Sequence, residues 1–164
     1  MSDQGFRIRG FRSDDLNRVM SINEECLPEN YSSFFYRDLY RRFPKTFVVA
    51  EADGEIQGYI MCRIETGLSK MKTLRPTRMS HVVSVAVRES YRRRGIASGV
   101  IKEALKQSRE EYGASECYLE VRLGNEPAIH LYNKLGFDKV KRNYGYYMDG
   151  EDAWVMAVSL EGES

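Results

Sequence analysis

The stretch SYRRRGIASGVIKEALKQ, residues 90–107, places dense positive charge where a helix begins. Apolar residues recur at helical spacing from Ile96 onward, so Arg92, Arg93 and Arg94 stand just before the helix N-terminus. That end of a helix already carries unpaired N–H groups and a partial positive charge, and it normally attracts acidic side chains. The surplus of arginine conflicts with this local preference, and such a conflict often marks a functional site.

The strand HVVSVAV, residues 81–87, leads through a short turn into this helix. Consecutive N–H groups of a strand-to-helix turn can point at one anion, and Gly95 and Ala97 would let a phosphate or pyrophosphate approach closely. The alternative is a solvated run of charges, and the turn by itself does not decide between the two. The stretch is not a Walker A loop, because no GK[ST] follows, and it lacks the full GxGxxG of a dinucleotide fold.

The rest of the chain predicts the element order β-α-α-β-β-β-α-β-α-β-β. TFVVAEA and EIQGYIMCRI flank Asp53-Gly54, a dipeptide typical of a β-hairpin turn. Before the hairpin we expect a strand over 6–11, a helix with Ser13 as its N-cap and a helix over 33–42; after it we expect an exposed basic loop over 66–80, the strand CYLEV and strands near GFDKVKR and AWVMAVSL. We also expect a helix that begins at Pro127 and ends at Gly136, with four residues facing inward: Ala128, Leu131, Tyr132 and Leu135. This order is typical of a mixed α/β (α+β) domain with a mostly antiparallel sheet.

Composition predicts one globular domain over residues 1–164. Hydrophobic residues make up 42% of the chain, enough for a core, and 25 Lys and Arg nearly balance 24 Asp and Glu. No bulk charge therefore favours nucleic acid or a membrane as partner. The start, MSDQGFRIRG, lacks the apolar core of a signal peptide, and no apolar run approaches membrane-spanning length. We therefore expect a cytoplasmic protein.

Cysteine and histidine usage favours neither a disulfide framework nor a metal site. Cys26, Cys62 and Cys117 are far apart, odd in number and without a CxxC pair, which is typical of thiols in a reducing compartment. With only His81 and His130 in the chain, a histidine-built metal site is disfavoured. We expect no metal.

Four stretches resemble the GNAT acetyltransferase superfamily. RRRGIA is similar to its R/Q-x-x-G-x-G/A signature, and LEVRLGNEPAIHLYNKLGF, residues 119–137, resembles its second motif, N-x-x-A-x-x-L-Y-x-K-x-G-F. CLPENY (26–31) and NYGYYMDGEDAWVM (143–156) resemble the protein N-terminal acetyltransferases, meaning the RimI-like enzymes and the catalytic subunit of the NatA complex. The resemblance runs along nearly the whole chain and implies the GNAT fold.

The resemblance also implies how acetyl-CoA is bound. The amides of residues 93–98 would cradle its pyrophosphate, and the edge of the Val85–Val87 strand would pair with its pantetheine arm. Tyr132 would protonate or hydrogen-bond the departing thiolate, with an ordinary buried tyrosine as the alternative; Asn125 would contact the cofactor, with a helix cap as the alternative. The expected cofactor-binding residues are Val85, Ala86, Val87, Arg92, Arg93, Arg94, Gly95, Ile96, Ala97, Ser98, Asn125 and Tyr132.

The base has three candidates. A model α-amine has a pKa of ~8 and is mostly protonated near pH 7, so a base is useful. Glu29 matches the family's substrate-side glutamate, Glu120 lies where RimI-like enzymes carry the catalytic glutamate, and His81 opens the strand before the arginine turn. The alternatives are an exposed loop acid for Glu29, a solvent-facing strand acid for Glu120 and a hydrogen-bonded polar residue without a catalytic role for His81. Which of the three is the main base stays open. No cysteine lies in a motif, so we expect direct attack in a ternary complex.

The resemblance implies a protein or nascent-peptide N-terminus as substrate, with small first residues such as Ser, Ala or Thr. The expected peptide-binding residues are Leu27, Pro28, Glu29, Tyr31, Tyr146 and Tyr147, for which an ordinary aromatic cluster is the alternative. The eukaryotic relatives work with an auxiliary subunit. The basic loop over 66–80 would steer acidic substrates or contact ribosomal RNA, and a solvated loop is the favoured alternative. Two other functions stay open: a GNAT enzyme that acetylates lysine side chains or small amines, and a non-catalytic acyl-CoA-binding or scaffold module. CLPENY and NYGYYMDGEDAWVM disfavour the first, and the acid/base residues disfavour the second.

Overall fold

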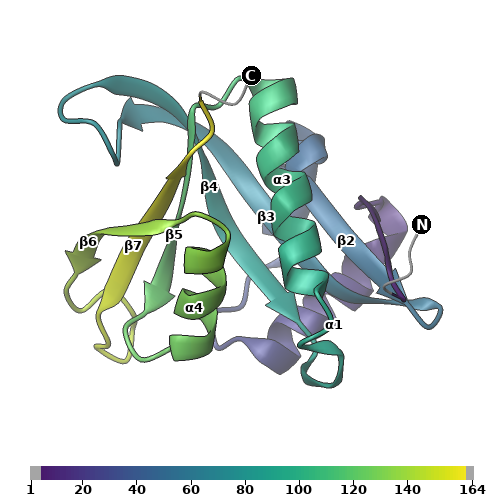
Figure 1. Cartoon of the computed structure of the whole chain (residues 1–164). Helices are drawn as coiled ribbons and strands as arrows, with labels where there is room; N and C mark the ends of the chain where they lie inside the picture. Colours follow the sequence, from purple (N-terminus) through teal and green to yellow (C-terminus); the bar gives the residue numbers. More distant parts are fainter. Residues whose placement is uncertain (1–4, 162–164) are drawn as a thin grey trace. The chain divides into compact units, whose positions relative to one another are not determined.

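A computed structural model describes residues 5–161 (Figure 1). The first four residues of MSDQGFRIRG, on which part of the signal-peptide prediction rests, lie outside the described residues. The strands are β1 Arg7–Gly10, β2 Phe47–Ala52, β3 Glu55–Leu68, β4 Pro76–Val87, β5 Glu116–Arg122, β6 Asp138–Asn143 and β7 Ala153–Ser159; the helices are α1 Leu16–Cys26, α2 Ser33–Arg42, α3 Ile96–Tyr112 and α4 Glu126–Lys134. The predicted element order is confirmed.

The strands form a seven-stranded sheet in the order β1-β2-β3-β4-β5-β7-β6. The β1–β2, β2–β3, β5–β7 and β6–β7 pairs are antiparallel, whereas β4 and β5 are parallel. The parallel ladder is confined to Met79–His81 and aligns His81 with Tyr118. Because alternate residues of a strand share a face, Tyr118 and Glu120 point to the same side of the sheet. The mixed, mostly antiparallel sheet is as predicted.

The described residues divide into two compact units: 5–63 with 83–107, and 64–82 with 108–161. The single domain expected over 1–164 stays a prediction. Within residues 5–161, no helix has the length and apolar character that crossing a membrane requires. Cys62 and Cys117 are buried, Cys26 is half-buried, and all three are thiols.

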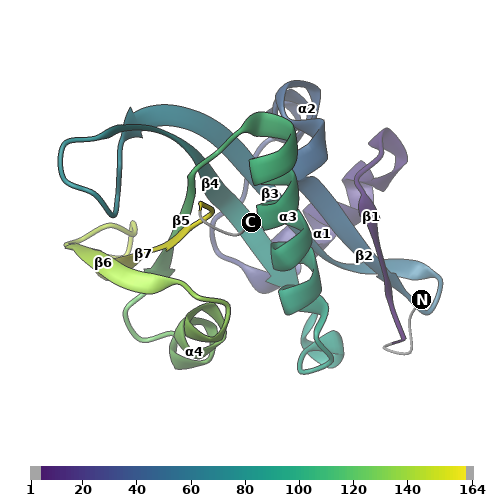
Figure 2. The ribbon, with the colours of Figure 1, turned by 45° about the horizontal axis from the view of Figure 1, so that its top comes forward.

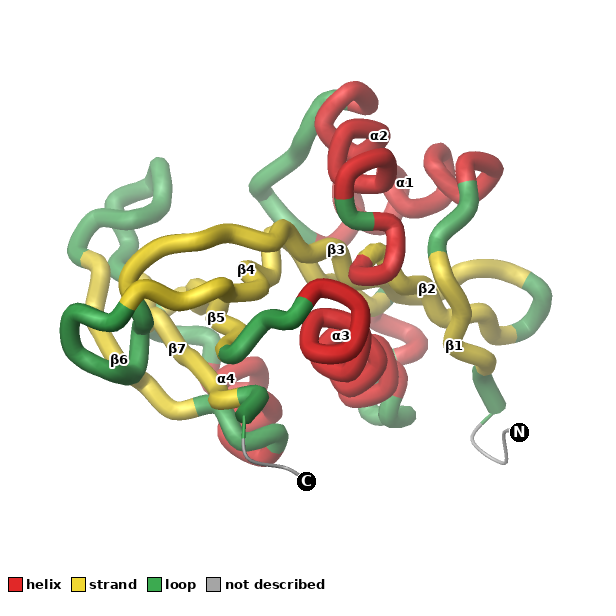
Figure 3. Tube along the Cα trace, turned by 90° about the horizontal axis from the view of Figure 1, so that it is seen from above, coloured by secondary structure: helices red, strands yellow, loops and turns green. Residues whose placement is uncertain are grey.

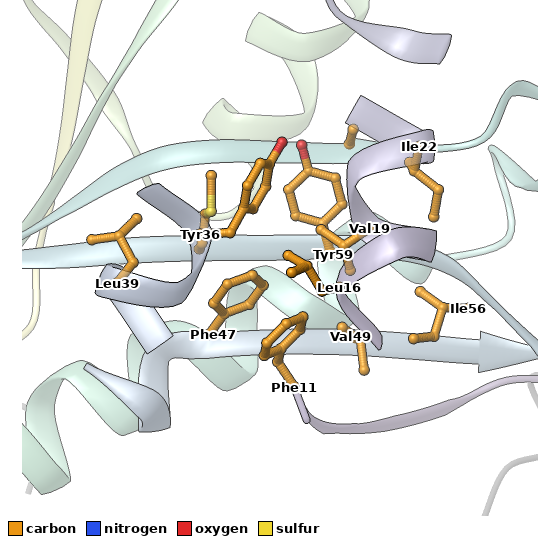
Figure 4. Close-up of a cluster of buried hydrophobic side chains, with 12 residues drawn as sticks. Phe11, Leu16, Val19, Ile22, Tyr36, Leu39, Phe47, Val49, Ile56 and Tyr59 are labelled. Atoms are coloured by element: carbon orange, nitrogen blue, oxygen red, sulfur yellow. The ribbon is translucent and has the colours of Figure 1, made fainter. Parts of the chain in front are cut away.

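In the first unit, helices lie on both faces of β2 and β3 (Figure 3). Helices α1 and α2 pack on one face through Leu16, Val19, Ile22, Tyr36 and Leu39, which meet Phe47, Val49 and Tyr59 (Figure 4). The start of α3 lies on the other face. There a Cβ added at Gly58 of β3 would lie 3.0 Å from Cγ2 of Ile96 and 3.2 Å from the carbonyl oxygen of Ala86. The glycine therefore lets the N-terminus of α3 rest directly on the strand.

In the second unit, α4 lies beside the strands β5, β6 and β7 (Figure 2). Its buried residues are Ile129 and Tyr132, whereas three of the four residues predicted to face inward, Ala128, Leu131 and Leu135, are half-buried. The helix begins at Glu126, one residue before the predicted Pro127, because the side chain of Asn125 caps it. Gly136 has a φ of +98° and ends the helix as predicted.

Ser13 does not cap α1, so that prediction is wrong. Residues Ser13–Asp15 form a 3-10 turn, and α1 begins only at Leu16. The Asp15 carboxylate instead accepts the backbone N–H of Arg12 at 2.7 Å and the guanidinium of Arg9 at 2.8 Å. Burial raises the pKa of Asp15, but the hydrogen bonds from Arg9 and Arg12 outweigh it and the net pKa is lowered. The Asp15 carboxylate thus closes the 3-10 turn before α1, and within the described residues no side-chain hydrogen bond caps α1 itself.

The predicted bounds of the exposed basic loop, residues 66–80, are also wrong. Strand β3 continues to Leu68 and β4 begins at Pro76, so only residues 69–75 connect them, and Met79 and Ser80 are buried. The buried carboxylate of Glu116 accepts the backbone N–H of Lys70 at 2.9 Å and the hydroxyl of Ser69. This anchor holds the start of the turn, which carries Lys70, Lys72 and Arg75, whereas Arg78 lies in β4.

Candidate active site

The arginine turn has the backbone geometry of an anion cradle. Arg93 and Gly95 both have positive φ, +65° and +87°, a conformation that glycine adopts without strain. The N–H of Gly99 donates to the carbonyl of Gly95 at 2.9 Å, the first hydrogen bond of α3. The N–H groups of residues 96–98 therefore have no acceptor within the helix. Such N–H groups, at the positive end of the helix dipole, suit a phosphate group.

Two of the three arginine side chains hold the turn itself. Arg92 donates its Nε–H to the carbonyl of Val87 at 2.8 Å, which ties the turn to the end of β4. The guanidinium of Arg94 lies 4.6 Å from the ring centroid of Tyr91, whose hydroxyl donates to Asp53 at 2.6 Å. The residues Arg92–Gly95 are exposed. The arginines thus shape the turn, and the backbone amides face any anion bound there.

The strand segment predicted to meet the pantetheine arm closes β4. Ala86 and Val87 are buried and Val85 is half-buried, so the side chains of this segment pack in the core of the first unit. Packing engages the side chains and leaves the backbone edge as the element that a pantetheine arm would pair with.

CLPENY follows α1 in the first unit. Leu27 donates its N–H to Asn23 and ends the helix, and Leu27 and Glu29 are half-buried whereas Pro28 is exposed. The ring of Tyr31 stacks on that of Phe35, with the centroids 4.7 Å apart. The hydroxyl of Tyr31 also donates to the carbonyl of Val83 in β4 at 3.3 Å. Tyr31 therefore ties the loop to the strand that leads into the arginine turn.

A buried polar chain supports this loop, and the sequence analysis missed it. The Asn30 amide donates to Oδ1 of Asn23 at 2.9 Å, and the Asn23 amide donates to the Tyr59 hydroxyl at 3.0 Å. Tyr59 and Ser84 share a hydrogen bond of 2.7 Å. Burial raises the pKa of Tyr59 to about 12, so its phenol keeps its proton at neutral pH. The sequence feature that could have revealed this chain is Asn23, a polar residue on the buried face of the first helix.

In the second unit the structure joins two of the three candidate bases. Nε2 of His81 lies 2.7 Å from Oε1 of Glu120, and both side chains are largely buried. Nδ1 of His81 lies 3.3 Å from Oε2 of Glu65 on β3. The rings of His81 and Tyr118 stack almost in parallel, 4.3 Å apart, and the Tyr118 hydroxyl donates to Glu65 at 2.6 Å. The sequence analysis predicted His81 and Glu120 separately and missed Glu65 and Tyr118.

Tyr132 and Asn125 lie on and before α4. Burial raises the pKa of Tyr132 to about 12, so the phenol is protonated at neutral pH. Its ring packs against Phe137, and within residues 5–161 no side-chain hydrogen bond involves its hydroxyl. Oδ1 of Asn125 accepts the N–H of Ala128 at 3.3 Å, so Asn125 has the capping role that was its alternative.

Tyr146 and Tyr147 lie in the loop between β6 and β7. Their rings meet edge to face at 4.9 Å, and Tyr146 remains 46% exposed. Tyr147 lies under the guanidinium of Arg122, 4.0 Å from its ring centroid, and Arg122 also contacts Asp149 and Glu151 at 2.9 Å each. An arginine from β5 therefore fixes one of the two tyrosines.

The DGED run of the same loop is structural. The carboxylate of Asp152 accepts the N–H of Gly145 at 2.7 Å and pairs with Arg142 at 2.6 Å, and these contacts lower its pKa. The N–H of Glu151 lowers the pKa of Asp149 in the same way, with a further contribution from Arg122. These acids, which the sequence analysis noted only as part of a motif, hold the tyrosines in place. Among the described residues, no group of three or more His, Cys, Asp or Glu could hold a metal ion.

Comparison with known proteins agrees with this fold and site. Residues 16–137 match the acetyltransferase (GNAT) family. An N-alpha-acetyltransferase of Sulfurisphaera tokodaii is 49% identical over 94% of this chain and 93% of its own. Naa20 of Chaetomium thermophilum, solved with a bisubstrate analogue, superposes with a TM-score of 0.80 at 29% identity over 93% of this chain and 86% of that one. NAA60 of Arabidopsis thaliana, solved with acetyl-CoA, superposes with a TM-score of 0.78 at 25% identity over 94% of this chain and 99% of that one.

The fold is that of an acetyltransferase. The chain belongs to the acetyltransferase (GNAT) family. It is an enzyme whose acetyl donor is acetyl-CoA.

Proposed function

We propose that this enzyme transfers the acetyl group of acetyl-CoA to the N-terminal α-amine of proteins, by direct attack in a ternary complex. The observation that carries the proposal is the contact of 2.7 Å between His81 and Glu120, an acid/base pair on the neighbouring parallel strands β4 and β5. The 49% identity to an N-alpha-acetyltransferase over nearly the whole chain supports the α-amine as acceptor.

The His81–Glu120 pair removes the proton of the incoming amine. An α-amine with a pKa of ~8 arrives mostly protonated, and only its neutral form attacks a thioester. A carboxylate accepts hydrogen bonds, so Glu120 can take the amine proton, which then lies between its Oε1 and Nε2 of His81. The three candidate bases therefore reduce to this pair and Glu29. Glu29 stays, in this proposal, the acid on the peptide side.

Tyr132 supplies the proton that the departing thiolate needs. Its pKa of about 12 keeps the phenol protonated at neutral pH, and its hydroxyl is not committed to another described side chain. A thiolate with a pKa of ~8.5 is easily protonated by a neighbouring donor once it leaves the acetyl group. Tyr132 thus acts as general acid or as hydrogen-bond donor.

The turn at residues 92–98 binds the pyrophosphate of the acetyl donor. The positive φ of Arg93 and Gly95 and the N–H groups at the start of α3 support this role. The backbone edge of Val85–Val87 pairs with the pantetheine arm. Asn125, which caps α4, is the least supported member of the expected cofactor set.

The peptide is held by the two loops that resemble N-terminal acetyltransferases. Leu27, Pro28, Glu29 and Tyr31 come from the loop after α1, and Tyr146 and Tyr147 from the loop between β6 and β7. The substrate is a protein or nascent-peptide N-terminus with a small first residue. An auxiliary subunit or the ribosome would then act on presentation of the substrate, because each expected catalytic residue belongs to this chain.

The test is acetyl transfer to short peptides that begin with Ser, Ala or Met and contain one internal lysine. Mass spectrometry locates the added acetyl group. The proposal requires acetylation of the α-amine and its loss in Glu120→Gln and Tyr132→Phe. Acetylation of lysine alone would keep the family and overturn the substrate, and binding of acetyl-CoA without transfer would favour a scaffold module.

A further inference from the structure

We infer that Glu65 and Tyr118 are positioning residues that hold the His81 ring in the orientation and tautomer that proton transfer with Glu120 needs. The inference rests on the proposed function, because it assigns a task to His81. Neither residue belongs to the stretches that resemble the family's catalytic or peptide-binding motifs.

Glu65 faces the nitrogen of His81 that Glu120 does not. Its Oε2 lies 3.3 Å from Nδ1, while Oε1 of Glu120 lies 2.7 Å from Nε2. A carboxylate next to Nδ1 accepts the Nδ1–H and so favours the tautomer with the proton on that nitrogen. Nε2 is then the nitrogen that exchanges a proton with Glu120. The amine proton passes to Glu120, on to Nε2, and from the imidazolium to solvent, with no other bond made or broken.

Tyr118 fixes the other degrees of freedom. Its hydroxyl donates to Oε1 of Glu65 at 2.6 Å, which leaves Oε2 of the same carboxylate towards His81. Its ring lies 4.3 Å from the imidazole with an angle of 4° between the planes. The parallel ladder aligns the backbones of His81 and Tyr118, so the stack stands on two hydrogen-bonded strands.

The described contacts of the imidazole include two carboxylates, those of Glu65 and Glu120, and the stacked ring of Tyr118. The ammonium of Lys70 also lies close by, 4.5 Å from the ring centroid of Tyr118. The side chains of His81 and Glu120 are 12% and 14% exposed, and that of Glu65 is 27% exposed. Burial of this degree keeps the ring from exchanging these contacts for water, so their removal should change the chemistry more than the binding of substrates.

The kinetic test compares Glu65→Gln, Tyr118→Phe and the double variant. Glu65→Gln is nearly isosteric, and Tyr118→Phe keeps the stacked ring while removing the hydroxyl. We expect each to lower kcat, Glu65→Gln by about tenfold, which is part of the 10²–10⁴-fold that acid–base catalysis contributes. KM for acetyl-CoA should not change. The double variant should be no slower than Glu65→Gln, because Tyr118 acts through Glu65. Glu161→Gln, which removes an exposed ion pair with Lys72, is the matched control.

A spectroscopic test does not depend on activity. The chain has two histidines, and His130 is exposed on α4, so its ring signals serve as an internal reference. In ¹⁵N-edited NMR of the imidazole rings, the wild type should show a slowly exchanging Nδ1–H of His81. That signal should disappear in Glu65→Ala, weaken in Tyr118→Phe and stay unchanged in Glu161→Gln.

Three results would overturn the inference: an unchanged kcat in folded Glu65→Gln, a double variant whose loss is the product of the single losses, or a persistent Nδ1–H signal in Glu65→Ala. Thermal denaturation checks that each variant is folded. A wild type that does not acetylate α-amines would count against the proposed function, and the NMR signal would then decide the positioning of His81 by itself.

Discussion

His81 and Glu120 face each other from neighbouring parallel strands, with Nε2 and Oε1 2.7 Å apart. Replacing Glu120 by Gln keeps the shape and removes the charge that accepts the proton. We expect kcat to fall by about 10²-fold, the lower end of the range for acid–base catalysis, with KM for acetyl-CoA unchanged. Steady-state kinetics measure both, and Glu110→Gln on the exposed end of α3 is the control. A normal kcat in Glu120→Gln would leave Glu29 as the base.

Tyr132→Phe removes one hydroxyl from a buried ring. Because no described side chain hydrogen-bonds that hydroxyl, the melting temperature should change by less than about 3 °C, the equivalent of about 1 kcal/mol. We expect kcat to fall by about 10²-fold, since the phenol, with a pKa of about 12, is the proposed proton donor. Tyr40→Phe, which keeps an edge-on contact with Phe11, is the control. A full rate in Tyr132→Phe would assign the thiolate proton to another donor.

Gly58→Ala tests whether β3 positions the arginine turn. The new Cβ would meet Ile96 at 3.0 Å and Val87 at 3.1 Å, so α3 or the strand must shift. Overpacking of this kind costs about 1–3 kcal/mol, and displaced amides should raise the Kd for acetyl-CoA by about tenfold. Calorimetry measures the Kd. Gly10→Ala on β1, where nothing lies within 4 Å of the added Cβ, should bind acetyl-CoA with the wild-type Kd. Equal Kd values in the two variants would show that Gly58 does not position the arginine turn.

Asp152→Asn tests the loop that carries Tyr146 and Tyr147. Loss of the charge weakens the contacts with Arg142 and the N–H of Gly145, so KM for the peptide should rise while the Kd for acetyl-CoA stays constant. Asp138→Asn at the exposed start of β6 is the control. A peptide KM equal to that of the wild type would remove the loop from substrate binding.

The Asp152 carboxylate should also make the loop between β6 and β7 sensitive to acid. The contacts with Gly145 and Arg142 lower the pKa of Asp152 in the folded loop below its ordinary value of 3.8. Because the pKa of Asp152 is lower in the folded loop than in the unfolded chain, its contacts stabilise the loop fully above the ordinary pKa. This stabilisation is lost as the pH falls through the lowered pKa of the folded loop. Amide exchange of Gly145 should therefore stay slow down to about pH 4 and accelerate below it, whereas in Asp152→Asn it should be fast throughout.

Local patterns in the sequence predicted the element order well. The Asp53-Gly54 hairpin, the helix over 33–42 and the start of α3 at Ile96 agree with the structure, because turn chemistry and helical periodicity act over a few residues. The N-cap of α1 and the loop over 66–80 were wrong for a different reason. Arg9 and Glu116, far from those segments or in another element, supply the deciding contacts.

The candidate site was predictable to a similar degree. Motifs identified the arginine turn, Glu120 and Tyr132 one at a time. The contact of His81 with both Glu65 and Glu120 depends on three strands meeting in register, and no local pattern encodes it. The same holds for Asn23 and Arg122, which support the peptide-binding loops from other elements.

The central claim, α-amine acetylation, is tested most directly with two matched peptides. One has a free N-terminal serine and an internal lysine replaced by arginine; the other keeps the lysine but has a formyl-blocked N-terminus. Initial rates are measured by release of CoA, with mass spectrometry of the products. The account predicts that the first peptide is acetylated and the second is not. Acetylation of the blocked peptide at a comparable or higher rate, with the first left unmodified, would contradict it.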